Sequence, residues 1–429
     1  MRTPRINILY ALLPLAFGLA CGGSSQPPAP PGSSGAFGIV TVNGKQKMYL
    51  PVSTLNSAGH GVVAVVDVGL KGNGVAGAPA LMADIDLGSA DIATTTGGDA
   101  KIVIAASTQN KKIWFIDPTS DTLIGSTQLD ATAGRSSFSG GGGYVTGIAV
   151  DSANRRAILS VWNGFALVDL NSKTITQTIL AAPSENFGFD GTRELIIAPF
   201  YDCPRNSGLP NPPPCDTYLA GDGTRISEGL NIIDLKDGTV YTYLNAAAAD
   251  PHAPVGEEPD SAAADPVAGI AVIPSEGNGN QNVIDLTKAN FNKANKTVTA
   301  PQTLVQNSSF TGVAIDSSQH LGFWEAEFSS RVGLMSVTDA RDSKGTFLPA
   351  QMPSAPGASG WSNIGDPHGI AVSTGIADGH PVGFLVNAGF KWIARIDLSV
   401  MATLPHAQGT MTSAELAPAV TFLDGRTKP

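Results

Sequence analysis

The chain is poor in charged residues and in long apolar segments, and each shortage excludes a class of protein. Only 14% of its 429 residues are charged while 42% are hydrophobic, so it can bury a large core and is not a disordered polymer. The apolar run near its N-terminus, Ile8 to Ala20, has 13 residues, which is too few for a helix to span a bilayer.

Several catalytic signatures are also missing. The sequence contains no G-x-S-x-G, no H-E-x-x-H and no G-x-x-x-x-G-K-[ST], and the glycine run 140–143 lacks the lysine that a phosphate-binding loop requires. Nucleophilic, zinc-protease and nucleotide chemistries therefore lose support. Without Arg2 and Arg5, 24 basic residues face 36 acidic ones, a net charge of −12. Such an acidic chain repels nucleic acid, so we expect no nucleic-acid partner.

Cysteine is scarce, and its placement is informative. The first of the three cysteines follows the apolar run, in Gly18-Leu19-Ala20-Cys21. This stretch resembles the lipobox of bacterial lipoproteins, which implies cleavage before Cys21 and its lipidation. Leu19 stands two places before the cysteine where the family usually has leucine three places before, and an ordinary secretory cleavage is the alternative. We expect residues 1–20 to be a signal peptide.

The residues after Cys21 suit a membrane anchor. The segment 22–35 contains only Gly, Ser, Gln, Pro and Ala, so it behaves as a partly stiffened tether. We therefore expect a lipidated flexible tether over 21–35 and a single domain over 36–429. The predicted location is extracytoplasmic, anchored by lipid to a bacterial membrane. By the sorting rule of one Gram-negative group, Gly22 favours the outer membrane or cell surface.

The other two cysteines predict a disulfide. Cys203 and Cys215 enclose a Pro- and Gly-rich segment that cannot order itself. A disulfide here would contribute roughly 3 kcal/mol in the chain-entropy model and implies an oxidising compartment. The alternative, a thiolate metal site, lacks a nearby His or second Cys pair.

A repeat of about fifty residues is the strongest signal in the chain. An Asp preceded in six of seven cases by an aliphatic residue recurs with gaps of 50, 52, 65, 51, 54 and 58 residues, at Asp67, Asp117, Asp169, Asp234, Asp285, Asp339 and Asp397. This period, with β-rich units and turn signals, is typical of a β-propeller. We therefore predict an all-β propeller with seven blades, and six as the alternative.

Each repeat is predicted to contain four strands. In the third unit these are residues 147–151, 156–161, 165–170 and 174–179. The opening phrase Gly-Ile-Ala-Val alternates small and branched residues, and the small ones would let sheets approach at the central axis. It or a close variant recurs at Gly269, Gly312 and Gly369. We take Gly269–Val272 as the opening strand of unit five, which leaves no obvious second strand there.

These units resemble propeller repeats of the NHL and YVTN type. The resemblance covers residues 36 to 425 and implies the fold, but the family includes binding scaffolds, lactonases and lyases. The repeated aspartates have a structural interpretation, because a strand-terminal Asp accepts hydrogen bonds from backbone amides two residues on. A calcium loop starting at Asp84 fails because the later acidic ligand is absent.

Two groups of residues are candidates for a functional site. Asp366 and His368 directly precede the seventh opening strand, where His368 would lie near the mouth of the central channel, and the phrase around them resembles streptogramin-lyase-like and amidating-lyase-like propellers. The matching positions in other units are Thr146, Ala268 and Thr311, so no convergent histidine set forms and a turn role is the alternative. Glu257 and Glu258 form the second group, within an Ala- and Pro-rich insertion, 245–265, that reads as a solvated loop.

Two classes of function remain. We favour a membrane-anchored binding or assembly scaffold for a protein or glycan, because no catalytic set converges. The alternative is a lactonase- or lyase-like enzyme at the channel mouth. We expect no cofactor, with calcium as the alternative. The enzyme gains support if the loop 203–215, the insertion 245–265 and His368 share one rim of the ring, and the scaffold if they do not.

Overall fold

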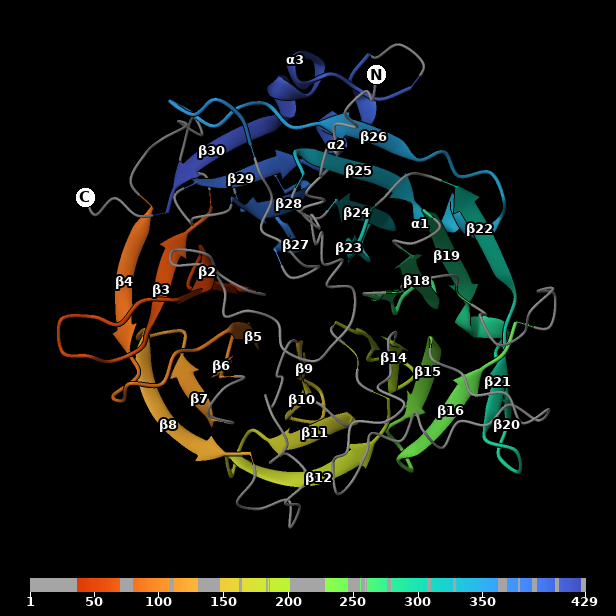
Figure 1. Cartoon of the computed structure of the whole chain (residues 1–429), viewed down its shortest axis with the longest axis horizontal. Coiled ribbons are helices and arrows are strands. Elements are labelled where there is room, and N and C mark those ends of the chain that lie inside the picture. Colours follow the sequence, from red (N-terminus) through yellow and green to blue (C-terminus); the bar gives the residue numbers. More distant parts are fainter. Residues whose placement is uncertain are drawn as a thin grey trace, which may run out of the picture.

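The chain folds into a seven-bladed β-propeller, as Figure 1 shows. The computed structural model describes residues 37–69, 80–107, 112–129, 147–161, 164–182, 184, 186–200, 228–245, 255, 259, 261–275, 279–306, 310–326, 329–361, 369–376, 379–387, 392–405 and 409–425. Its strands form seven sheets around one axis, which confirms the predicted fold with seven blades rather than six.

The blades follow one another in chain order. Blade 1 contains β1 (Gly38–Val42), β2 (Lys45–Val52), β3 (Val62–Asp67) and β4 (Leu81–Asp86). Blade 2 contains β5 (Thr95–Asp99), β6 (Ile102–Ala106), β7 (Lys112–Asp117) and β8 (Thr122–Gln128). Blade 3 contains β9 (Ile148–Asp151), β10 (Arg156–Val161), β11 (Gly164–Asp169) and β12 (Thr174–Leu180). Blade 4 contains β13 (Gly188–Asp190), β14 (Leu195–Phe200), β15 (Gly229–Asp234) and β16 (Thr239–Tyr243).

The last three blades carry extra elements. Blade 5 contains β17 (Ala263–Asp265), β18 (Ile270–Ser275), β19 (Asn280–Asp285) and β22 (Gln302–Gln306), with η3 (Leu286–Lys288), β20 (Asn290–Asn292) and β21 (Thr297–Thr299) inserted before β22. Blade 6 contains β23 (Gly312–Asp316), β24 (Leu321–Glu325), β25 (Arg331–Ser336), α1 (Val337–Arg341) and β26 (Leu348–Gln351). Blade 7 contains β27 (Ile370–Thr374), β28 (Pro381–Val386), β29 (Trp392–Asp397), α2 (Leu398–Thr403), α3 (Ser413–Leu416), η4 (Ala417–Ala419) and β30 (Val420–Asp424).

The ring closes by packing rather than by strand exchange. Every strand of blade 1 comes from the N-terminal part of the chain and every strand of blade 7 from the C-terminal part. At their boundary, Met48 and Leu50 of β2 belong to one buried apolar cluster with Val382 and Phe384 of β28. Burial of such side chains contributes roughly 1.5–3 kcal/mol each, so this cluster stabilises the closed ring.

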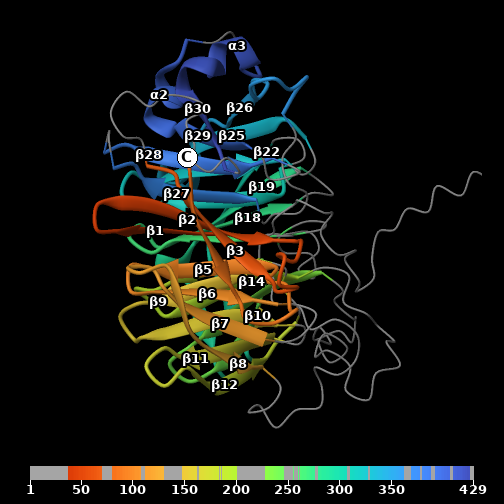
Figure 2. The same ribbon diagram turned by 90° about the vertical axis from the view of Figure 1, so that its left-hand side faces the viewer.

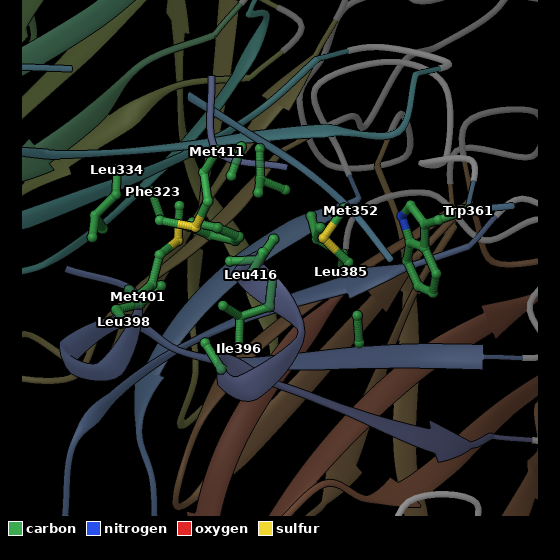
Figure 3. Packing of buried hydrophobic residues seen from close by; sticks show 14 of the residues in the cluster. Phe323, Leu334, Met352, Trp361, Leu385, Ile396, Leu398, Met401, Met411 and Leu416 are labelled. Atoms are coloured by element: carbon green, nitrogen blue, oxygen red, sulfur yellow. The ribbon is translucent and has the colours of Figure 1, made fainter. Parts of the chain in front are cut away.

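Similar apolar clusters fill the other boundaries between blades. Strands covered on both faces by neighbouring sheets need side chains that are apolar throughout, and β6 and β14 are buried along their whole length. Between blades 6 and 7, Phe323 and Leu334 pack with Leu385 and Ile396, and α2 and α3 add methionine and leucine side chains around them (Figure 3). Since each sheet buries a face against its neighbour, no blade has a complete core by itself.

The inner strands approach closely because glycine occurs on them. A Cβ on Gly97 of β5 would lie 2.8 Å from the Cβ of Ile148 in blade 3, and one on Gly38 would lie 3.0 Å from the Cα of Gly97. Real Cβ atoms essentially never show contacts under 3.0 Å, and a contact of 3.0 Å is tighter than nine in ten of theirs. Small residues thus let neighbouring sheets approach at Gly38 and Gly97, two glycines outside the Gly-Ile-Ala-Val phrase for which this was predicted.

The repeated aspartates stabilise turns, as predicted. Six of them end the third strand of a blade, and there the carboxylate accepts backbone amides two or three residues on. Asp117 Oδ1 lies 2.8 Å from Thr119 N, Asp169 Oδ1 lies 2.6 Å from Ser172 N, and Asp397 Oδ1 lies 2.8 Å from Val400 N. Each bond satisfies an amide that the sheet leaves without a partner.

The seventh aspartate of the series does not occupy this position. Ser336 ends the third strand of blade 6, and its Oγ accepts the amide of Asp339 at 3.3 Å as the N-cap of α1. A hydroxyl can replace the carboxylate because both accept a hydrogen bond from a nearby amide. Asp339 therefore lies inside the first turn of a helix, and its place in the repeat was misassigned from the sequence.

The predicted opening strand of blade 5 is wrong as well. Gly269 is a turn residue with φ of +66°, and β18, which follows it, pairs with β19, so it is the second strand. The inner strand is β17 (Ala263–Asp265), inside the segment that reads as a solvated insertion. The error arose because glycine at the end of the first turn mimics glycine at the start of an opening strand.

The outer edges of blades 4 to 7 are covered by the next blade in the ring. Strand β21 of blade 5 pairs in parallel with β16 of blade 4, and Met411 of blade 7 pairs with Ala350 of β26. The carbonyl of Arg341 in α1 accepts the Thr303 hydroxyl of β22 at 3.1 Å. Across the ring closure, Ala80 N donates to the carbonyl of Asp424 at 3.2 Å. These contacts occupy strand edges that would otherwise pair with other chains.

The outer strands of blades 1 to 3 differ from those of blades 4 to 7 in their pairing. The pairings of β3 with β4, β7 with β8 and β11 with β12 each contain a register shift. The equivalent outer pairings of blades 4 to 7 run without one. A β-bulge twists an edge and interrupts its ladder, so bulges occur where no neighbouring element pairs with the outer strand among the described residues.

Candidate functional site

The two faces of the ring differ, and this difference defines the candidate site. One face of the ring, here named the loop face, carries the connections between second and third strands and those between blades. The opposite face, here named the turn face, carries the connections between first and second strands and between third and fourth strands. The first strand of each blade runs from the loop face to the turn face. The strands that separate these faces are seen from the side in Figure 2.

The turn face is held together by polar contacts between blades. Each contact joins neighbouring blades through side chains at or near these turns. They are Lys47 Nζ with Asp121 Oδ2 at 2.7 Å, Ser152 Oγ with Asp99 Oδ2 at 2.6 Å, Arg156 Nη2 with Glu194 Oε2 at 3.2 Å, Arg193 Nη1 with the carbonyl of Pro266 at 3.2 Å, His320 Nδ1 with Asp265 Oδ2 at 2.6 Å, and Gln46 Nε2 with Ser373 Oγ at 3.0 Å. Among the described residues, contacts of this kind bridge six of the seven boundaries, so the turn face is a rigid base.

The sequence-predicted site residues all lie outside the described residues. Cys203 and Cys215 fall between β14 and β15, Glu257 and Glu258 between β16 and β17, and Asp366 and His368 between β26 and β27, while Cys21 precedes the first described residue. The disulfide and the lipid site therefore stay predictions. The strand ends that flank these three internal segments lie on one face, the loop face.

Val255 lies within the acidic insertion 245–265, and it is firmly anchored. Val255 is fully buried, and its carbonyl accepts hydrogen bonds from the Asn282 amide at 2.7 Å and from the Ser275 hydroxyl. Gln302 Nε2 donates to Asn282 Oδ1 at 2.6 Å, which fixes that amide. The prediction of a solvated loop over 245–265 is thus wrong at Val255, two residues before Glu257, because apolar burial and a satisfied polar network hold it.

A buried carboxyl group that sequence reasoning missed lies at the loop-face end of blade 6. Glu325, at the loop-face end of β24, is 1% exposed. Its Oε1 lies 3.0 Å from the point that a Cβ on Gly312 would occupy, and Ile370 Cγ2 lies 3.3 Å from the same point. Ile370 begins β27, so Glu325 lies beside the start of the strand that follows the predicted His368 segment in the sequence. The signal for this group in the sequence was a charged residue directly after the apolar run Leu321–Trp324.

Exposed polar pairs occupy the loop face of blades 1 and 2. Asp86 accepts bonds from the Gly88 amide at 2.7 Å, from Asn56 Nδ2 at 3.0 Å and from His60 Nδ1 at 2.9 Å. The Gly88 amide is the main cause of a lowered Asp86 pKa. Beside them, Lys112 Nζ lies 3.2 Å from Asp91 Oδ2. These pairs show that the described loop face is polar at this edge.

Metal ligands do not gather in the described part of the chain. Within those residues, no three or more His, Cys, Asp or Glu side chains are placed to hold a metal ion. Among the same residues, no helix has the length and apolar character needed to cross a membrane.

Comparison with known proteins shows the fold and nothing finer. No protein-family model matches the sequence, and no curated protein matches it. The WD40 domain of Toxoplasma gondii coronin superposes with a TM-score of 0.52 at 11% identity, covering 95% of each chain. A hydrazine synthase chain of Kuenenia stuttgartiensis superposes with a TM-score of 0.51 at 12% identity, covering 88% of this chain and 98% of that one. Both likenesses support the propeller architecture.

Proposed function

We propose that this protein is a lipid-anchored extracytoplasmic propeller that binds a protein or glycan through its loop face. The observation that supports this most is the difference between the two faces. In blades 2 to 4 the third-to-fourth connections of the turn face are short turns closed by aspartates, in blades 5 to 7 they contain a hairpin or helices, and polar contacts bridge this face between blades. The loop face instead receives the long connections 201–228 and 244–262. Variable connections on a rigid scaffold are where binding residues concentrate.

Lipidation at Cys21 supplies the location in this proposal. Acyl chains contribute about 0.8 kcal/mol per buried methylene, so several of them hold a protein on a membrane without a spanning helix. Expression of the full chain should place it in the membrane fraction, with labelled fatty acid incorporated. Cys21→Ala should abolish incorporation and release the protein. Incorporation that survives in Cys21→Ala would contradict the anchor.

The binding role is tested with the soluble form lacking residues 1–21. A polyethylene glycol chain is attached through an unnatural azide side chain either at Leu55, 44% exposed on the loop face, or at Val267, 71% exposed on the turn face. A partner recovered from cell envelopes should be lost with the Leu55 conjugate and retained with the Val267 conjugate. Loss with Val267 alone would contradict loop-face binding.

An enzyme of lactonase or lyase type is the second candidate. Two observations favour it: the strand ends flanking 201–227, 246–254 and 362–368 share one face, and the carboxyl group of Glu325 is buried beside the start of β27. In this reading His368 acts at the channel mouth. Metal content and turnover of lactones and esters by the soluble form test it. Turnover should disappear in His368→Ala and persist in His380→Ala, a histidine of the turn face; absence of turnover leaves the binding role.

A further inference from the structure

The point at which the chain enters the ring fixes which face the tether leaves. Phe37 is 6% exposed and belongs to the apolar cluster between blades 1 and 7. The next residue, Gly38, donates its amide to Thr96 Oγ1 at 2.9 Å and begins β1. Because first strands run from the loop face to the turn face, this firmly held entry point lies on the loop face.

The tether is short compared with the ring. Between Cys21 and the first described residue, Phe37, lie the 15 residues 22–36. A fully flexible chain of that length would have a root-mean-square end-to-end distance of about 20 Å, a partly stiffened one somewhat more, and either reaches about 50 Å only when fully extended. Strands of this length add roughly 20 Å between the two faces. To bring the turn face to the bilayer, the tether would have to run past the whole thickness of the ring and stay nearly extended.

We infer that the loop face is held toward the membrane that carries the lipid, and that the turn face points away from it. This inference depends on the proposed lipid anchor at Cys21. It adds that a ligand reaches the loop-face site through the space between the ring and the bilayer, so ligands presented by the same membrane are favoured over large soluble ones. The surface turned toward the bilayer is the described loop-face rim, and the tether holds it there without lipid contacts of its own.

Energy transfer to the bilayer tests the orientation. The full lipidated chain, with one donor dye at Leu55 or at Val267, is reconstituted in phosphatidylcholine and phosphatidylglycerol vesicles that carry an acceptor on lipid head groups. The dyes are attached through an unnatural amino acid, and flotation confirms equal vesicle binding. Because the tether is short compared with the path around the ring, transfer from Leu55 should exceed that from Val267 by about twofold or more. Equal or reversed transfer with intact binding overturns the inference.

One further variant and the flotation of the unmodified chain separate the causes. Twenty Gly and Ser residues inserted after Gly35 lengthen the tether, and the difference between the two dyes should then disappear. If it persists, the loop face itself binds lipid and the tether argument is wrong. If the unmodified lipidated chain does not float with the vesicles, the anchor at Cys21 fails, which is distinguishable from a bound ring in the wrong orientation.

Discussion

His320 and Asp265 join blades 5 and 6 through a contact of 2.6 Å between the imidazole Nδ1 and a carboxylate Oδ2. The carboxylate is fully buried, and its Oδ1 accepts the amides of Val267 and Ala268, each at 3.0 Å. His320 thus binds the second carboxylate oxygen of an Asp whose first oxygen already caps a turn. Inter-blade contact and turn stabilisation meet in one residue.

Removal of this imidazole should destabilise the ring. His320 has φ of +58°, so His320→Gly removes the side chain without adding backbone strain. We expect a loss of about 1.5–3 kcal/mol in the free energy of unfolding, because a buried carboxylate loses a hydrogen bond. Urea unfolding measures it. The control is His60→Ala, which breaks a pair with Asp86 in which both side chains are more than a third exposed. Its effect on the free energy of unfolding should be much smaller, because solvent screens such a pair. Equal losses would argue against a special role for His320.

The crowded axis predicts a second effect. Gly97→Ala would place a Cβ 2.8 Å from both the Cβ and the carbonyl oxygen of Ile148, and overpacking of this kind costs about 1–3 kcal/mol. Gly360→Ala is the matched control, since nothing lies within 4 Å of its Cβ. Thermal unfolding should show a lowered midpoint for Gly97→Ala and no decrease for Gly360→Ala. A neutral Gly97→Ala would mean that the inner strands can separate.

The repeat period predicted the fold because it reflects turn chemistry, which is local. Asp117 and Asp169 bond to amides within three residues, so their spacing survives in the sequence. Which strand opens each blade was harder to predict, because Gly269 suits a turn and an opening strand equally well. Contacts between blades could not be predicted: Val255 is held by Asn282 and Ser275, and no local pattern records that pairing. The same holds for Glu325, whose neighbours come from two other strands.

The hairpin β20–β21 of blade 5 covers the edge of blade 4, and a residue in its turn should control the pKa of Asp237. Lys293 Nζ lies 2.8 Å from Asp237 Oδ2 in blade 4 and is the main cause that lowers the pKa of Asp237 to about 2. Lys293→Ala should return that pKa toward its usual value near 3.9, as measured by carboxyl 13C titration. Lys288→Ala, which removes a pair with Asp285 instead, should leave Asp237 low. An unchanged Asp237 in Lys293→Ala would contradict this cause.

The sign of the accompanying pH effect follows from that lowered pKa. Because the folded-state value lies below the unfolded one, the stabilisation by Asp237 is complete above about pH 4 and is lost as the pH falls toward 2. The docked hairpin should therefore loosen in this window in the native protein. Amide exchange at Thr242 and Leu244, which donate to the carbonyls of Lys296 and Val298, reports docking. In Lys293→Ala these amides should already exchange faster at neutral pH.

Removal of the same hairpin should expose a strand that can pair with other chains. Strand β16 lacks the register shift found in the outer pairings of blades 1 to 3, and β21 pairs along it. Replacing residues 290–299 with a short Gly-Ser turn leaves a regular, unprotected edge, which favours association between copies. Light scattering after size-exclusion chromatography should show dimers or larger species. Thr242→Lys in the shortened chain places a charge on the edge and should restore the monomer, whereas association that persists would have another origin, such as exposure of Tyr241 and Tyr243.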